Sequence, residues 1–207
     1  MVRAVVELDA ATMKQTEWMA GGDVRLVIEP ERGGGQAVTI ELALEPGQRS
    51  ILAAGPATAL APGRYSVKAE LRPKNGRLPL QVTTFATVPP DTATIGTSAL
   101  ALRRGPSTGL AYQPTADPRF RRTERLRVEI PRLADGLTPT ARVLTREGQP
   151  MPLVVTLTER RDESAHINLA VAEVALAPLA AGEYVLEVSF EKGGKTDAVS
   201  YGFRLIP

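Results

Sequence analysis

Leu60-Ala61-Pro62-Gly63-Arg64-Tyr65-Ser66-Val67 returns 119 residues later as Leu179-Ala180-Ala181-Gly182-Glu183-Tyr184-Val185-Leu186. Each copy has the pattern of a turn that leads into a strand, because apolar and polar residues alternate from the tyrosine onward. Such alternation predicts one buried face and one solvated face. The residues expected to point inward are Tyr65, Val67, Ala69 and Leu71 in the first copy and Tyr184, Leu186, Val188 and Phe190 in the second. Two copies at this spacing predict two β-sandwich domains in tandem.

The rest of the chain consists of short alternating segments separated by glycine, proline and asparagine. Helical periodicity is nearly absent, apart from a short helical turn expected within residues 11–19. Lys74-Asn75-Gly76-Arg77 predicts a hairpin with a type I′ turn, and Gly33-Gly34-Gly35 predicts another turn. Further strands are expected at residues 1–8, 24–29, 38–44, 49–54, 80–88, 98–102, 126–130, 140–146, 152–159, 166–176 and 197–206.

Many short strands with this punctuation are typical of a sandwich or barrel. The predicted fold class is therefore all-β, with two tandem immunoglobulin-like sandwiches. Fibronectin-III-like modules, which have different edge strands, are the alternative, and the sequence does not separate the two.

Two consecutive prolines mark the expected boundary between the domains. Val88-Pro89-Pro90-Asp91-Thr92 ends the strand pattern, because proline cannot donate to a sheet and stiffens a connector. We expect a first domain over residues 1–92 and a second over residues 97–207. The polar stretch 103–123 has little periodicity and is too long for a hairpin loop. It is therefore expected to wrap a sheet edge or to carry binding residues.

Composition excludes several classes of function. The 25 basic and 23 acidic side chains nearly balance, so no strong basic excess points to a nucleic-acid partner. The absence of cysteine excludes disulfides, thiolate metal sites and cysteine nucleophiles. No apolar run reaches the ~20 residues of a membrane span. Residues 1–8 have the pattern of a strand and not of an export signal. This leaves a cytosolic protein, a mature chain or a portion of a longer protein, and we expect the last of these.

Three segments of the second half resemble one bacterial family. Arg103–Gly109, Pro114–Glu129 and Leu176–Tyr184 resemble the C-terminal part of von Willebrand factor type A-related domain proteins, and the resemblance is best over about residues 97–207. Residues 1–96 look like the preceding module. The resemblance implies an exported chain with a type A domain upstream, and it implies no activity. The Asp-x-Ser-x-Ser metal motif of a type A domain is absent, because the nearest stretch, residues 9–13, lacks both serines.

A cluster of seven arginines between residues 103 and 127 is the sharpest local feature. It indicates either a surface for an anionic partner, such as a polysaccharide, a lipid head group or an acidic protein face, or a solvated loop beside a strand. The candidate interaction surface consists of Arg103, Arg104, Arg119, Arg121 and Arg122.

Several single residues have two interpretations. His166, the only histidine, is expected to be structural or exposed, because no second histidine or cysteine accompanies it. Trp18, the only tryptophan, is expected in a core or between domains, and stacking on a sugar ring is the alternative. Tyr65 and Tyr184 are expected to bond backbone near a turn, as the tyrosine of a sandwich corner does.

No catalytic or cofactor site is predicted. Carboxylates at two places could gather around Ca²⁺, namely Asp162 and Glu163 with Glu159, or Asp117 with Glu124, but no calcium-loop pattern is present, so no metal is expected. A nucleophile elbow of the form Gly-x-Ser-x-Gly is absent as well. We therefore expect a non-enzymatic structural or protein-interaction module of an exported protein that spaces or presents a type A domain. A carbohydrate-binding or adhesion module at the cell surface is the alternative.

Overall fold

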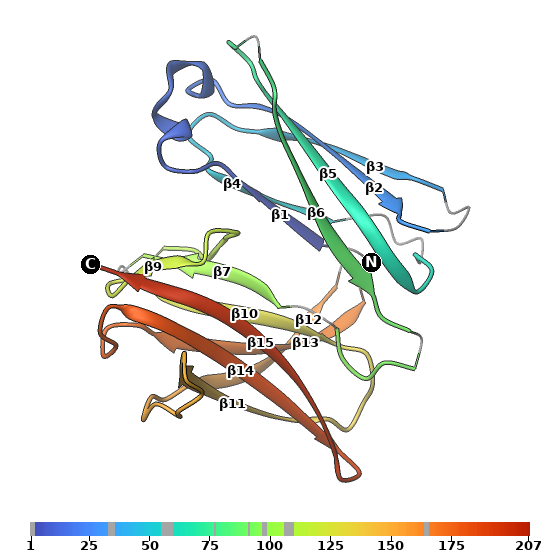
Figure 1. Ribbon diagram of the computed structural model, residues 1–207, viewed down its shortest axis with the longest axis vertical. Helices are drawn as coiled ribbons and strands as arrows, with labels where there is room; N and C mark the ends of the chain where they lie inside the picture. Colours follow the sequence, from blue (N-terminus) through green and yellow to red (C-terminus); the bar gives the residue numbers. More distant parts are fainter. Residues whose placement is uncertain are drawn as a thin grey trace. The chain divides into compact units, whose positions relative to one another are not determined.

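The computed structural model describes residues 3–32, 36–54, 60–76, 78–90, 92–96, 99–105, 110–163 and 166–207. The chain is almost entirely β-structure and divides into two compact units, Met1–Asp91 and Thr92–Pro207 (Figure 1). The prediction of an all-β protein with sandwich domains is confirmed. Residues 94–96 belong to the second unit, because the Gly96 N–H donates to the Pro131 carbonyl at 2.8 Å and Ile95 forms a bridge with Arg132.

Unit 1 packs a four-stranded antiparallel sheet against a two-stranded one. The larger sheet has the order β3-β2-β5-β6, and the smaller sheet pairs β1 with β4 (Figure 1). The strands are β1 (Arg3–Glu7), β2 (Gly22–Pro30), β3 (Val38–Leu44), β4 (Ser50–Ala54), β5 (Gly63–Pro73) and β6 (Leu80–Val88). The Gly33–Gly35 turn lies outside the described residues.

The core of unit 1 lies between its two sheets, against the apolar faces of the neighbouring strands β2 and β5. The four predicted inward residues of β5 are all buried, and the register places Leu26 beside Ala69 and Ile28 beside Val67. Trp18 joins this core with 2% of its surface exposed. Burying side chains of this size stabilises the fold by about 1.5–3 kcal/mol each.

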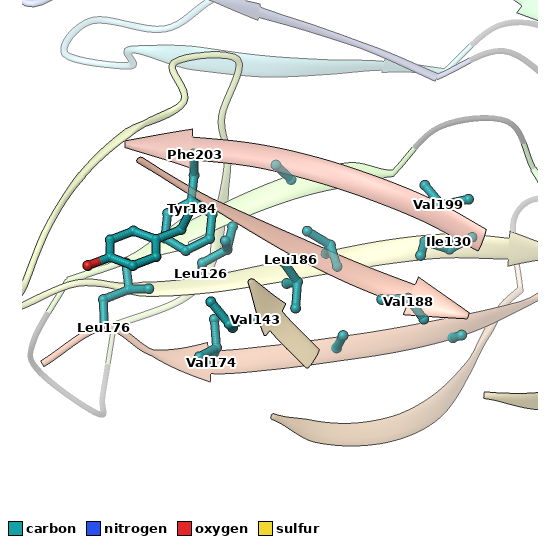
Figure 2. Close-up of a cluster of buried hydrophobic side chains, with 14 of the residues drawn as sticks. Leu126, Ile130, Val143, Val174, Leu176, Tyr184, Leu186, Val188, Val199 and Phe203 are labelled. Carbon is teal, nitrogen blue, oxygen red and sulfur yellow. The ribbon is translucent and has the colours of Figure 1, made fainter. Parts of the chain in front are cut away.

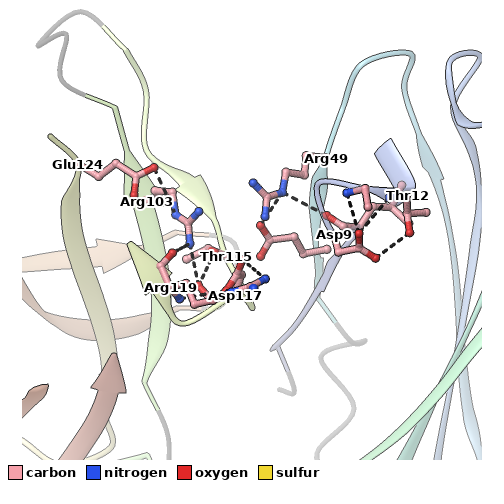
Figure 3. A network of polar contacts seen from close by, with 11 residues as sticks. Asp9, Thr12, Arg49, Arg103, Thr115, Asp117, Arg119 and Glu124 are labelled. Carbon is pink, nitrogen blue, oxygen red and sulfur yellow. Dashed lines mark hydrogen bonds and ion pairs between the residues drawn. The ribbon is translucent and has the colours of Figure 1, made fainter. Parts of the chain in front are cut away.

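The helical turn expected within residues 11–19 is present as two short 3-10 turns, η1 (Thr12–Lys14) and η2 (Thr16–Trp18). Asp9 stabilises the start of the first turn through hydrogen bonds from its carboxylate. Its Oδ1 accepts hydrogen bonds from the backbone N–H groups of Ala11 and Thr12 at 2.8 and 3.0 Å, and its Oδ2 accepts one from the Thr12 hydroxyl at 2.7 Å (Figure 3). These bonds lower the pKa of Asp9, and the bond from the Thr12 hydroxyl has the largest effect.

The predicted hairpin between β5 and β6 is present, but its turn is not type I′. A type I′ turn needs positive φ at both central residues, and neither Asn75 nor Gly76 has one. β5 ends at Pro73 and β6 begins at Leu80, with Leu71 paired to Leu80. The connection is therefore longer than a two-residue loop, and Asn75 and Gly76 do not adopt the left-handed backbone for which Asn-Gly is suited.

Unit 2 is a sandwich of five and four strands. The orders are β12-β13-β10-β7-β8 and β11-β14-β15-β9 (Figure 1). In the first sheet, β7, β10, β13 and β12 correspond to the immunoglobulin strands A, B, E and D. In the second sheet, β11, β14 and β15 correspond to strands C, F and G, so the two sheets have the immunoglobulin arrangement. The strands are β7 (Leu100–Arg104), β8 (Gln113–Pro114), β9 (Arg119–Arg121), β10 (Arg125–Arg132), β11 (Thr138–Thr145), β12 (Thr156–Asp162), β13 (Ile167–Ala175), β14 (Gly182–Lys192) and β15 (Lys195–Ile206).

The core of unit 2 fills the space between these two sheets. Figure 2 shows Leu126 of β10 and Leu186 of β14 among its central side chains, and both are fully buried. At one end, the rings of Tyr184 and Phe203 stack with centroids 5.7 Å apart. Phe120 of β9 meets Phe203 edge-on at 6.1 Å, so a residue from the polar 103–123 stretch completes the core.

The 103–123 stretch passes from one sheet of unit 2 to the other. β8 pairs with β7 in the first sheet, and β9 then pairs with β15 in the second. The β9–β15 pairing is parallel and joins Phe120 to Leu205. Of the two roles considered for this stretch, wrapping a sheet edge is the one that the fold displays.

The two units have equivalent central strands, β5 and β14, but different edge strands. The first and last residues of β14 lie 119 positions after those of β5, and each of the two strands lies between its hairpin partner and an earlier strand. In unit 1 the next strand, β3, extends the β5 sheet, whereas in unit 2 β12 joins the opposite sheet. β9 covers the edge of β15, but β6, the counterpart of β15, is an edge strand.

Candidate interaction surfaces

Arg103 and Arg119 hold the start of β9 in place. The Arg103 Nη2 donates to the carbonyls of Asp117 and Arg119, both at 2.7 Å (Figure 3). Its guanidinium lies 4.5 Å from the centroid of the Phe120 ring. Arg119 pairs with Asp117 through Nε and Oδ1 at 2.9 Å. Burial acts to raise the pKa of Asp117, but the bonds from Arg119 outweigh it and lower the pKa.

Arg104 belongs to a second cluster, on strands β7, β10 and β13. Three guanidiniums surround the Glu173 carboxylate, at 3.5 Å from Arg104, 3.5 Å from Arg125 and 3.1 Å from Arg127. The Tyr112 ring lies 4.6 Å from the Arg104 guanidinium and 3.8 Å from that of Arg127. One carboxylate therefore compensates part of the charge of three arginines, and an aromatic ring screens two of them.

The pKa values in this cluster follow from burial and charge. Burial, and then the neighbouring Glu173 carboxylate, raise the pKa of Tyr112 to about 12. Burial alone would raise the pKa of Glu173. The Tyr112 hydroxyl and the guanidiniums of Arg127 and Arg104 outweigh that effect, so the pKa of Glu173 is lowered. At neutral pH Glu173 is therefore ionised and Tyr112 is neutral.

The remaining two predicted surface residues differ from one another. Arg122 donates from Nε and Nη2 to the Ala177 carbonyl at 3.1 and 2.6 Å, which ties it to the turn before β14. Arg121 is exposed, and its backbone N–H donates to Glu124 at 2.6 Å. The sequence cluster is therefore spread over three places, and the guanidiniums of Arg103, Arg104 and Arg122 have partners within unit 2.

The structure also places the other residues considered from the sequence. His166 is exposed in the turn before β13 and has a φ of 53°, which is uncommon for a residue with a side chain. Trp18 is buried, so it is not a platform for a sugar ring. Within the described ranges, no group of three or more His, Cys, Asp or Glu residues could hold a metal ion. No helix among those residues has the length and apolar character needed to cross a bilayer.

Sequence reasoning missed an exposed apolar strand in unit 1. Leu80, Val82 and Phe85 of β6 keep 44%, 58% and 53% of their surface exposed, and Thr83 and Thr84 between them are exposed as well. We refer to these five residues as the β6 surface. The signal in the sequence was the absence of any charged residue from Leu78 to Pro90, although charged residues make up 23% of the chain.

The β6 surface is exposed because the opposite sheet is narrow. Leu80 and Val82 lie on the core side of the sheet, since they pair with the inward-facing Leu71 and Ala69. The smaller sheet has only two strands, and β4 lies against β3 at the far edge from β6. On the other side of the sheet, the Arg64 guanidinium lies 4.5 Å from the centroid of the Phe85 ring.

Comparisons with known proteins add little to this picture. No family model matches the chain, and no curated protein matches it. Among solved structures, the chain is similar to the cadherin-like domains 1 to 4 of zebrafish RET, with 9% sequence identity and a TM-score of 0.21. The match covers 89% of this chain and 41% of that one, so the chain spans less than half of the RET structure.

Proposed function

We propose that this chain is a non-catalytic protein-interaction module that binds its partner through the β6 surface of unit 1. The observation that carries the proposal is an edge strand of nine residues, Leu80–Val88, with exposed apolar side chains and no charge. Edge strands of this kind attract a further strand, and proteins usually protect them with charges, prolines or bulges. An unprotected edge on a stable sandwich supports a role in binding.

Strand addition would supply both affinity and specificity at this edge. The backbone of the added strand bonds to the backbone of β6, and alternate side chains contact the two faces of the sheet. Leu80 and Val82 would be covered on one face and Phe85 on the other. Each square ångström of apolar surface removed from water contributes about 25 cal/mol.

The proposed setting is an exported bacterial protein in which these units space or present a von Willebrand type A domain. Support for this part comes from the resemblance of residues 97–207 to that family. Its test is an antibody against this chain, used on fractions of the source cells. A band well above 22.1 kDa in the envelope or secreted fraction is expected, and a band of 22.1 kDa in the cytosol would overturn this setting.

A cross-linking group placed on β6 itself tests the binding role directly. A photoreactive benzophenone amino acid at Thr83, which is exposed on β6, is expected to capture a protein in living source cells. The matched control carries the same group at Thr39, which is exposed on β3 at the other edge of the same sheet. Equal capture from both positions, or capture from neither, would contradict a binding role for β6.

A further inference from the structure

The other long edge strands of this protein carry the charges that β6 lacks. β3 has Glu41, β11 has Arg142, and β12 has four consecutive charged residues from Glu159 to Asp162. Charges on an edge oppose pairing with another strand, because the added strand would have to strip water from them. β6 is longer than β3 and β12, and it is free of charge along its whole length. The contrast singles out β6 as an edge adapted to pairing.

Unit 2 shows what occupies the same position when the edge is closed. β15 is the counterpart of β6, and β9 pairs with it and buries Phe120 completely. Among the described strands, β6 pairs with β5 alone. In the part of unit 1 that the structure describes, the edge of β6 therefore has no counterpart of β9.

The sequence of β6 is complementary to itself in the antiparallel direction. Thr84 is the middle residue of Leu80–Val88, so pairing around it sets Thr84 opposite Thr84 of the other strand. Val82 then lies opposite Ala86, and Leu80 lies opposite Val88. All four of these residues are apolar and lie on the core side of the sheet. On the outer side, Phe85 lies opposite Thr83. Aromatic and β-branched partners of this kind are favourable cross-strand pairs.

Symmetry restricts the register further. A two-fold axis perpendicular to the sheet keeps the core sides of the two copies on the same side, which requires residues of equal parity to face each other. Pairing around Thr84 meets this requirement and uses all nine residues. A shift by one residue would set core-side residues against outer ones. A two-residue shift would leave strand ends unpaired.

We propose that β6 pairs with β6 of a second copy, antiparallel and around a two-fold axis at Thr84, so that the chain forms a symmetric dimer. The inference rests on the proposed function, because it names the partner of the same β6 surface. The two four-stranded sheets become one sheet of eight strands, ordered β3-β2-β5-β6 in one copy and reversed in its partner.

The first test is the mass of the purified full chain in sedimentation equilibrium over a wide concentration range. The expected result is an approach to twice 22.1 kDa with rising concentration. Thr84→Lys sets two like charges opposite each other and is expected to weaken dimerisation by about tenfold or more. Thr39→Lys, the same change on the charged edge β3, is expected to leave dimerisation unchanged. A monomer at all concentrations, or equal dimerisation of the Thr84→Lys variant and the wild type, overturns the inference.

Charge exchange separates a lost contact from a damaged fold. Thr84→Glu alone is expected to be monomeric, as is Thr84→Lys, whereas an equal mixture of the two variants is expected to form a heterodimer. Misfolded variants would not recover on mixing. Failure of the mixture to associate, with both variants folded by circular dichroism, contradicts pairing at Thr84.

A cysteine at the axis tests the register. Directly opposite residues of an antiparallel pair have Cα atoms about 4.5–5.5 Å apart, within the range of a disulfide. Because the chain has no other cysteine, oxidised Thr84→Cys is expected to give a covalent dimer, and Thr39→Cys is expected to give little. Equal yields would contradict the register. If the wild type is monomeric but the photoreactive group at Thr83 captures a different protein, the dimer is wrong and the proposed function stands.

Discussion

Tyr65 and Tyr184 make the same hydrogen bond in the two units. The Tyr65 hydroxyl donates to the Ala61 carbonyl at 2.8 Å, and the Tyr184 hydroxyl donates to the Ala180 carbonyl at 3.0 Å. Both acceptors lie four residues before the tyrosine, in the turn that leads into β5 or β14. The same tyrosine corner therefore occurs in both units and fixes where β5 and β14 begin, as expected from the sequence.

Removal of either hydroxyl is expected to lower the free energy of unfolding by about 1 kcal/mol, because one hydrogen bond is lost and a carbonyl loses its partner. The substitutions are Tyr65→Phe and Tyr184→Phe, which keep the ring in the core. Urea unfolding followed by circular dichroism measures the change. Unaltered midpoints in both variants would show that the corner bonds contribute nothing to stability.

Trp18 is expected to report on the fold of unit 1. It is the only tryptophan in the sequence, and 2% of its surface is exposed, so its emission should shift to longer wavelength when unit 1 unfolds. Trp18→Ala is expected to cost about 3–5 kcal/mol through the cavity it leaves. Thermal unfolding by circular dichroism measures this cost. Emission at long wavelength from the native protein would contradict the burial of Trp18.

Gly22 is expected to tolerate no side chain. A Cβ at this position would lie 2.6 Å from the Arg72 carbonyl oxygen and 2.8 Å from the ring of Trp18. Gly22→Ala should therefore destabilise the protein by about 1–3 kcal/mol through overpacking. Gly202→Ala is the control, because nothing lies within 4 Å of a Cβ there. Equal unfolding midpoints for the two variants would refute the close approach.

Glu173 is expected to stabilise unit 2 in a pH-dependent manner. Because its pKa is lowered in the folded state from the ordinary value of 4.5, its contribution is complete above that unfolded value. The contribution is lost as the pH falls through the lower folded pKa. Glu173→Gln leaves three arginines without their shared carboxylate, and it should cost about 2 kcal/mol at pH 7, the size of hydrogen bonds to a charged group.

Urea unfolding at neutral and acidic pH measures this difference. The wild type should lose more stability than Glu173→Gln on acidification, so the two unfolding midpoints should converge. Glu147→Gln, at an exposed turn position, controls for the change of net charge. A constant gap between the wild type and Glu173→Gln across the range would contradict the assigned pKa direction.

Local alternation allowed most of the strands and the tyrosine corners to be predicted, but not β8 and β9, which lie in the 103–123 stretch. The roles of the arginines could not be predicted in the same way. Arg122 bonds to the Ala177 carbonyl, 55 residues away, and Arg103 bonds to carbonyls 14 and 16 residues away. These partners are brought together by the strand order, which a single sequence does not reveal.

The exposure of β6 was also beyond local reasoning. Its alternation of Leu80, Val82 and Ala86 is that of a half-buried strand, and the same pattern in β5 is fully covered. What differs is the number of strands in the opposite sheet, which depends on contacts far along the chain. In the sequence, only the absence of charge from Leu78 to Pro90 distinguishes β6 from the edge strands that carry charged residues.

The parallel pairing of β9 with β15 has a mechanical consequence. A pull on β9 toward its amino end and on β15 toward its carboxyl end draws these neighbouring parallel strands in opposite directions along their length. The hydrogen bonds that join Arg119–Arg121 to Arg204–Ile206 are then loaded together in shear and cannot be peeled apart one at a time. Under a stretching load, the β9–β15 pairing therefore resists separation of these two strands in shear.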